Sequence, residues 1–211
     1  MNNRKTNINQ VARALFMKDL EEIEYYILAH LKKVKQKWGT MGNCKETKIT
    51  SRICEEINLN LSTELHSFRF MYGRTHNKNH NKEVYPDISI NWIGKVGEQE
   101  KFLDIECKRI NGSRVLAGKY IENGINRFLS QKYLTLNGYA FMIAYVQKED
   151  ANINRKIINK VLAGNKFKIS GCETIQELAP GKNFEVVFNS KHKNNKVNKL
   201  ISIKHFMFDC R

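Results

Sequence analysis

Apolar residues near the start of the chain recur every three or four positions. Between residues 11 and 38 they include Leu15, Phe16, Leu20, Ile23, Ile27, Leu31, Val34 and Trp38. Such spacing places apolar side chains on one face of a helix, so we predict a long amphipathic helix over residues 11–38. A second helix of about three turns is predicted from Glu46 to Ile57, because Asn58 then interrupts the apolar spacing.

The rest of the chain contains β-favouring or continuous apolar segments bounded by turn residues, together with two more segments of helical spacing. In chain order the predicted elements are strands 64–72, 87–93 and 101–110, helix 119–136, strand 139–146, helix 153–162, and strands 184–188 and 200–208. The last two strands are expected to form a C-terminal β-hairpin, residues 184–208, around a Lys- and Asn-rich turn at 190–199. This order predicts an α/β fold in one domain, residues 1–211, with a central mixed β-sheet flanked by helices.

Two of the predicted strands carry their polar residues on one face. In the strand that begins at Asp87, polar residues alternate with apolar ones, so one face is buried and the other presents Asp87. The next strand alternates in the same way and sets Asp104, Glu106 and Lys108 on one face. If the two strands pair, these polar faces coincide, which gathers carboxylates and an ammonium group on an otherwise apolar sheet.

Carboxylates that lie close together repel one another unless a cation lies between them. Mg²⁺ prefers a few carboxylate oxygens together with water and phosphate oxygens, so we expect Asp87 and Glu106 to hold Mg²⁺, with Mn²⁺ as a substitute. Lys108 could orient a metal-activated water or neutralise negative charge on a phosphate. Asp104 shares this face but precedes the Glu106 and Lys108 pair, so we expect it to play a flanking polar role.

The sequence Pro86-Asp87, followed nineteen residues later by Glu106-Cys107-Lys108, resembles the PD-(D/E)xK motif of the restriction-endonuclease-like nuclease superfamily. The resemblance covers about residues 46–146, whose predicted order α-β-β-β-α-β is the order that the superfamily's core implies. It implies a metal-dependent DNA endonuclease that hydrolyses phosphodiester bonds, in a setting such as restriction or defence against phage and mobile elements. Asp87, Glu106 and Lys108 would be its catalytic residues.

The superfamily usually adds an acidic residue from a helix that precedes the first strand, and three residues compete for that role. Glu46 lies on the same helical stripe as the apolar residues of the second predicted helix, and it is the preferred catalytic residue and metal ligand. The helix dipole also favours an acid at a helix start, which is the structural alternative for Glu46. Glu56 lies beside the apolar stripe, and Glu24 lies near the apolar face of the first helix.

The chain is strongly basic, with 36 Lys and Arg against 21 Asp and Glu and a formal net charge of +15. This balance favours a polyanionic partner, and we expect DNA. Arg109 and Arg114 flank the predicted site, and Lys119 and Arg127 lie on the following helix. All four are candidates to bind nucleic acid, with a solvated basic surface as the alternative. Gly124 in that helix is expected to allow close packing or close backbone approach. The alternative functions are a non-catalytic basic DNA-binding module and an RNA-cleaving nuclease with the same site.

The five cysteines are odd in number and never spaced as Cys-x-x-Cys, so neither a disulfide framework nor a zinc ribbon is predicted. A reducing cytoplasm is therefore the expected location. The first residues lack the apolar segment of a secretion signal, and no apolar run approaches the roughly 18 residues that cross a bilayer. Neither an organic cofactor nor a membrane is expected as a partner. A homodimer stays open, since cuts on two strands could require two copies.

Overall fold

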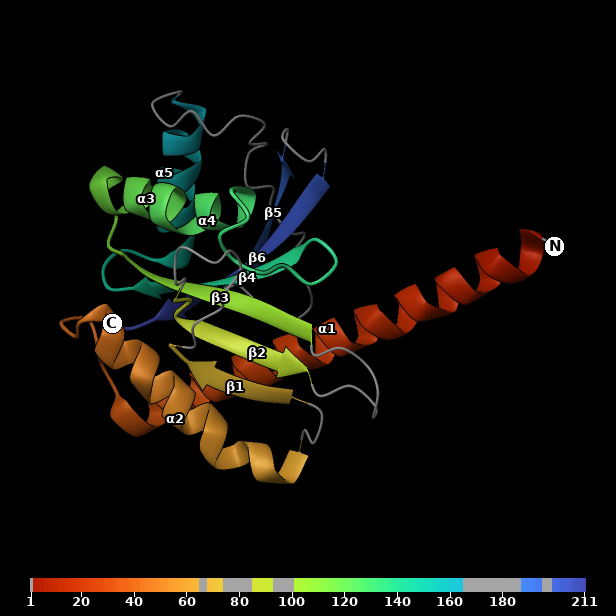
Figure 1. The fold of residues 1–211 in the computed structure, drawn as a ribbon. Coiled ribbons are helices and arrows are strands. Elements are labelled where there is room, and N and C mark those ends of the chain that lie inside the picture. The colour runs from red at the N-terminus through yellow and green to blue at the C-terminus, as the bar shows by residue number, and fades with distance from the viewer. Residues whose placement is uncertain (1, 65–67, 74–84, 93–100, 165–186, 195–198) are drawn as a thin grey trace.

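The computed structural model describes residues 2–64, 68–73, 85–92, 101–164, 187–194 and 199–211. Its helices are α1 (Asn2–Trp38), α2 (Glu46–Glu64), α3 (Arg114–Tyr120), the π-helix η1 (Ile121–Ile125), α4 (Asn126–Leu129) and α5 (Ala151–Ala163). Its strands are β1 (Phe68–Tyr72), β2 (Ile88–Trp92), β3 (Lys101–Ile110), β4 (Tyr139–Val146), β5 (Val187–Asn194) and β6 (Lys199–Asp209). One sheet lies between two sets of helices, which gives three layers (Figure 1).

The strands in the described residues form one six-stranded sheet in the order β1-β2-β3-β4-β6-β5. β2 is antiparallel to both of its neighbours, β1 and β3, whereas β4 is parallel to both β3 and β6. β5 pairs antiparallel with β6, as expected for the C-terminal hairpin. The predicted α/β fold, with a mixed sheet flanked by helices, is therefore confirmed. The predicted pairing of the strand that follows Asp87 with the strand that contains Glu106 is confirmed as well.

Helices α1 and α2 cover one face of the sheet. The apolar stripe of α1 contributes Ile27 to this core, and that of α2 contributes Ile49 and Ile53, each fully buried. They belong to one apolar cluster with Ile105 and Cys107 of β3. The alternation predicted for β3 is thus confirmed on its apolar side, because these side chains face the two long helices.

The helical segments α3 to α5 cover the opposite face, on which the polar residues of β3 lie (Figure 1). Tyr120, Ile125 and Phe128 are fully buried there and pack with the small and apolar side chains of β4. Because helices cover both faces, β4 is buried along almost its whole length, as its continuous apolar sequence predicted.

The helix predicted at 119–136 differs from the structure at both ends. It begins earlier, at Arg114, because the Ser113 hydroxyl accepts a hydrogen bond from the Leu116 amide at 3.2 Å and caps the helix. It ends at Leu129, beyond which the chain turns onto the sheet and the Leu134 amide donates to Asp104 Oδ2 at 2.8 Å. A contact with a distant strand therefore overrides the local helical spacing.

Other predicted boundaries also differ from the structure, including the strand predicted from residue 64, because β1 begins at Phe68 and Glu64 still belongs to α2. α2 continues to Glu64, through the asparagines that we expected to end it, because asparagine disfavours a helix by less than about 1 kcal/mol per residue. α1 begins at Asn2 rather than residue 11. The predicted turn 190–199 is largely strand, because Ser190 and His192 are buried while Lys191 between them is exposed, which is the alternation of a strand.

Candidate active site

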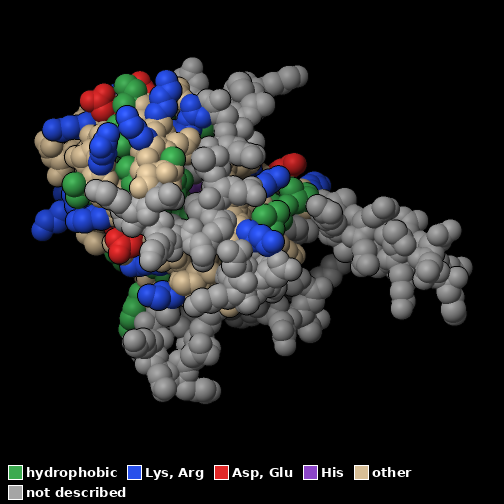
Figure 2. Space-filling view, turned by 90° about the horizontal axis from the view of Figure 1, so that it is seen from above, with side chains coloured by type: hydrophobic (Ala, Val, Ile, Leu, Met, Phe, Trp, Pro, Cys, Tyr) green, Lys and Arg blue, Asp and Glu red, His purple; other side chains and the backbone are tan. Residues whose placement is uncertain are grey.

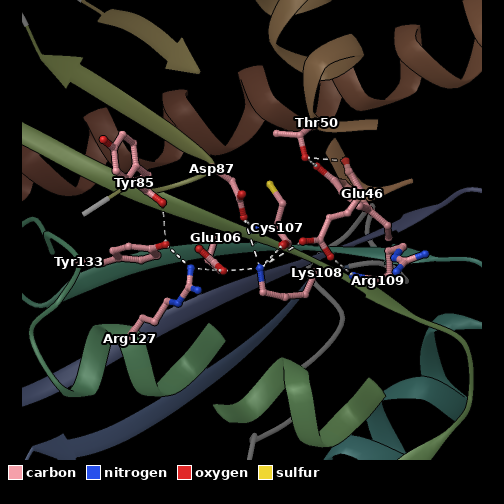
Figure 3. Close-up of polar contacts among 11 residues, drawn as sticks. Glu46, Thr50, Tyr85, Asp87, Glu106, Cys107, Lys108, Arg109, Arg127 and Tyr133 are labelled. Carbon is pink, nitrogen blue, oxygen red and sulfur yellow. Dashed lines mark hydrogen bonds and ion pairs between the residues drawn. The ribbon is translucent and has the colours of Figure 1, made fainter. Parts of the chain in front are cut away.

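Asp87, Glu106 and Lys108 lie together at the point where β2 begins beside β3 (Figure 3). Ile88, the first residue of β2, pairs with Ile105, so Asp87 enters the sheet next to Glu106. β3 then continues to Ile110 with no β2 residue beside it. The site is therefore built on an open edge of β3, with α3 and α4 on one side of it and α2 on the other (Figure 3).

Two carboxylates occupy this open edge of β3. The Cys107 amide donates to Asp87 Oδ2 at 2.8 Å, and the Arg109 amide donates to Glu46 Oε2 at 3.0 Å. These amides are two residues apart and point the same way, and a backbone N–H that loses its strand partner needs another acceptor. The end of β2 thus explains why one acid from a loop and one from the start of α2 meet at the same strand.

The ammonium group of Lys108 lies among three carboxylates. Its Nζ is 3.3 Å from Glu46 Oε1 and 3.6 Å from Asp87 Oδ2, and it also forms an ion pair with Glu106. It donates a further hydrogen bond to the Cys107 carbonyl at 2.8 Å. Burial on its own lowers the pKa of Lys108, but the three carboxylates outweigh it and raise the pKa to about 12. Lys108 is therefore a fixed positive charge at neutral pH.

Glu106 is the buried member of the group, with no exposed side-chain surface. Its Oε1 accepts from Lys108 and, at 2.8 Å, from Arg127 Nη1, whereas Oε2 has no hydrogen-bond partner among the described residues. Burial first, and then the negative charge of Asp87, raise the pKa of Glu106 to about 7. A buried carboxylate oxygen without a partner is unfavourable, so Oε2 is a vacant acceptor that a cation would satisfy.

Arg127 and Tyr133 connect Glu106 to the segment that carries Asp87. Arg127 Nη1 also donates to the Tyr133 hydroxyl, and the guanidinium lies 5.2 Å from the centre of the Tyr133 ring. The same hydroxyl donates to the Tyr85 carbonyl at 3.0 Å, two residues before Asp87. Burial first, and then Glu106, raise the pKa of the Tyr133 hydroxyl well above its ordinary value, so it stays a hydrogen-bond donor.

The three candidates for the additional acidic residue of the site, Glu46, Glu56 and Glu24, have different partners. Glu46, the preferred candidate, is the one that forms an ion pair with Lys108. Glu56 pairs with Lys37 at 3.4 Å, and Glu24 pairs with Lys204. Contact with Lys108 therefore singles out Glu46 from these three candidates.

Asp104 shares the face of Glu106 but takes part in a different set of contacts. It accepts from the Ser89 hydroxyl through Oδ1 and from the Leu134 amide through Oδ2, each at 2.8 Å. Through the Leu134 amide, Asp104 holds the segment after α4 against the sheet, and Tyr133 is the neighbouring residue of that segment. Its place agrees with the flanking polar role that we expected.

No group of three or more His, Cys, Asp and Glu side chains in the described residues is arranged so that it could hold a metal ion as it stands. The carboxylates of Asp87, Glu106 and Glu46 instead surround the ammonium of Lys108. The donor set still has the chemistry that Mg²⁺ prefers, because all its ligand atoms are carboxylate oxygens. The unpartnered Oε2 of Glu106 adds a buried acceptor to that set.

The four basic residues predicted to bind nucleic acid fall into two groups. Arg109, Arg114 and Lys119 are exposed, whereas Arg127 is engaged with Glu106. Figure 2 looks onto the side of the molecule that α3 and α5 cover, where Lys and Arg side chains are spread with a few acidic ones among them. The exposed basic residues of these helices are Arg114, Lys119, Lys156 and Lys160.

Gly124 in η1 lies against the site, as its predicted packing role requires. A β-carbon at this position would collide with the end of the Met142 side chain and lie 3.8 Å from Lys108 Cγ. The close packing expected at Gly124 is therefore confirmed.

Tyr133 is the site residue that sequence reasoning missed, together with the role of Arg127 in holding Glu106. Tyr133 falls in the segment that we predicted to be helical, and no motif or spacing marks it. Its contacts depend on the turn after α4, which brings residues far apart in sequence together.

No protein-family model matches this chain, and neither a curated protein nor a solved structure is significantly similar to it. None of the helices in the described ranges has both the length and the apolar character to cross a membrane. Cys44, Cys54, Cys107 and Cys210 are free thiols, and Cys172 lies outside the described residues.

Proposed function

We propose that this chain is a metal-dependent endonuclease that hydrolyses phosphodiester bonds in DNA, built on a restriction-endonuclease-like core. The observation that carries the proposal is the meeting of Asp87, Glu106 and Glu46 around Lys108, from three segments that are far apart in the sequence. The order of elements from α2 through β1, β2, β3 and α3 to β4 supports it, because the superfamily's core would have the same order. The net charge of +15 favours a polyanionic substrate.

Asp87, Glu106 and Glu46 would hold the metal ion, which we propose to be Mg²⁺ with Mn²⁺ as a substitute. When bound, such an ion stabilises negative charge on a phosphoryl oxygen and makes a bound water more acidic. The chain orients the three carboxylates beforehand. Backbone amides fix one oxygen each of Asp87 and Glu46, while Arg127 and Lys108 fix Oε1 of Glu106.

Lys108 has an electrostatic role in this proposal. The three carboxylates around it raise its pKa to about 12, so Lys108 is charged at neutral pH while it pairs with them. A fixed ammonium beside the reacting phosphate would stabilise the negative charge that develops in the transition state. A carboxylate pair without this cation would hold a metal but would lack that stabilisation.

Plasmid cleavage tests the proposal. Purified protein is incubated with supercoiled plasmid and Mg²⁺ or Mn²⁺, and nicked and linear DNA are quantified over time. We expect Asp87→Ala and Lys108→Ala each to reduce cleavage by at least about a hundredfold. Lys33→Gln, which removes an exposed charge from α1 on the opposite side of the sheet, should cleave like the unaltered protein. Thermal unfolding checks that every variant is folded.

Cleavage that survived both substitutions, or no cleavage with any divalent metal, would contradict the proposal. The second outcome would favour a basic DNA-binding module without catalysis. One observation is compatible with that function: the carboxylates already pair with Lys108 and Arg127, so the group is held together without a metal. A parallel reaction with single-stranded RNA separates DNA cleavage from RNA cleavage by the same residues.

A further inference from the structure

Arg127 uses only a small part of its hydrogen-bonding capacity. Within the described part of the chain, both hydrogen bonds of its side chain come from Nη1, one to Glu106 Oε1 and one to the Tyr133 hydroxyl. A guanidinium carries five N–H donors in a planar fork that matches a phosphate group. The side chain of Arg127 is 35% exposed, so part of it is accessible to a bound ligand.

The two cations that pair with Glu106 contact the same one of its carboxylate oxygens. Arg127 and Lys108 both bind Oε1, while Oε2 is buried and without a partner. A divalent ion that used Oε2 would place two positive charges close to both cations. Like charges at such short range repel strongly at the low effective dielectric of a buried site. At least one of the two contacts with Glu106 would therefore weaken when an ion binds.

Lys108 and Arg127 differ in what else holds them. Lys108 is only 13% exposed and has three further acceptors within 3.6 Å, on Glu46, Asp87 and the Cys107 carbonyl. Beyond Glu106, Arg127 is held by the Tyr133 side chain, through a hydrogen bond and its aromatic face. Arg127 is thus the cation that can leave Glu106, and Tyr133 keeps it next to the site.

We propose that Arg127 exchanges partners when the site takes up a divalent ion. Without the ion, Arg127 neutralises Glu106; with the ion bound, Arg127 turns its guanidinium to a phosphate of the nucleic acid while Tyr133 still holds it. This inference rests on the proposed function and deepens it, because it makes one phosphate contact conditional on the metal. Metal binding and substrate binding are then coupled through a single side chain.

Metal binding in the absence of nucleic acid tests the first half of the exchange. The dissociation constant of Mn²⁺ is measured by calorimetry or electron paramagnetic resonance for the unaltered protein, Arg127→Gln and Arg127→Lys. We expect Arg127→Gln to bind Mn²⁺ about tenfold more tightly, because a competing positive charge is gone. Arg127→Lys keeps the charge and should bind Mn²⁺ like the unaltered protein. Unchanged or weaker binding by Arg127→Gln overturns the exchange.

Binding of a short DNA duplex tests the second half. Affinity is measured with Ca²⁺, which takes carboxylate oxygen ligands, and again with a chelator that removes divalent ions. We expect Arg127→Gln to weaken DNA binding about tenfold with Ca²⁺ and to leave it unchanged with the chelator. Lys132→Gln removes an exposed charge from the segment after α4 and serves as the control, with the same effect in both conditions. An equal loss in both conditions for Arg127→Gln overturns the exchange.

A further variant separates this inference from the proposed function. If Glu106→Gln binds Mn²⁺ as well as the unaltered protein does, the site is not the metal site, and the proposed function fails together with the exchange. If Glu106→Gln loses Mn²⁺ binding but Arg127→Gln behaves like the unaltered protein, the proposed metal site stands. In that case only the exchange is wrong.

Discussion

Glu46 engages the site with both of its carboxylate oxygens. Oε1 lies 3.3 Å from Lys108 Nζ, and Oε2 accepts from the Arg109 amide at 3.0 Å. The side chain is 27% exposed, so most of it is buried against these partners. These contacts make Glu46 more than a helix-start residue favoured by the dipole. At the scale of single residues, it links α2 to the open edge of β3.

The role of Glu46 can be tested by comparison with Glu56. Glu46→Gln keeps the shape of the side chain and an oxygen for the Arg109 amide but loses the negative charge. We expect the plasmid-cleavage rate to fall about a hundredfold. Glu56→Gln should leave cleavage unchanged, because Glu56 pairs with Lys37 and not with Lys108. An equal loss of cleavage in both variants would remove Glu46 from the proposed metal site.

At the scale of elements, a buried polar chain joins α3 to β6 and β5. The Tyr120 hydroxyl lies 2.8 Å from His205 Nδ1, and His205 Nε2 lies 2.7 Å from the Ser190 hydroxyl. His192 Nε2 lies 2.6 Å from the same hydroxyl. Burial lowers the pKa of His192 to about 4, and burial together with His192 lowers the pKa of His205 to about 3. Both imidazoles are therefore neutral in the folded protein at neutral pH.

This polar chain predicts a loss of stability in acid. An unfolded histidine takes up a proton near pH 6.5, whereas folded His205 does not do so until about pH 3, so stability falls as the pH drops from 6.5 towards 3. At pH 5 the effect of His205 alone is about 2 kcal/mol relative to pH 8. Urea unfolding at a series of pH values should show a shallower decline for His205→Gln than for the unaltered protein. Identical slopes would mean that His205 does not remain neutral in the folded state.

At the scale of the whole molecule, the three layers separate the stabilising core from the candidate site. α1 and α2 bury the apolar face of β3, while the polar face of the same strand meets the helical layer that carries the exposed basic residues. The DNA substrate proposed above should contact these residues largely through its phosphates. Such binding releases counterions and therefore depends strongly on salt.

DNA affinity should fall steeply as the salt concentration rises. Each phosphate contact contributes about −0.9 to the slope of log affinity against log salt, so contacts from the exposed Arg109, Arg114 and Lys119 predict a slope near −3 or steeper. Arg114→Gln should make the slope about one unit shallower, measured by fluorescence anisotropy with a duplex. Lys33→Gln, on α1, should leave the slope unchanged. A slope that does not respond to Arg114→Gln would place the DNA elsewhere.

The sequence by itself determined the features that burial imposes on each segment separately. The bounds of β3 and β4 were predicted as the structure has them, because alternation or continuity of apolar residues reports directly which faces are buried. The same alternation predicted that Asp87, Glu106 and Lys108 would share a surface. A local pattern is sufficient to predict these strands, because β3 buries one apolar face and β4 buries both faces.

Only the tertiary structure decided which distant side chains complete the site. Periodicity did not distinguish Glu46 from Glu24 and Glu56, whereas the structure pairs Glu46 with Lys108. Periodicity also predicted that Tyr133 is helical, but the helix ends at Leu129. These outcomes depend on where β2 begins beside β3 and on how the chain turns after α4. A hydrogen bond or ion pair between residues far apart in sequence forms only after packing has set their distance, so no local pattern of the chain encodes it.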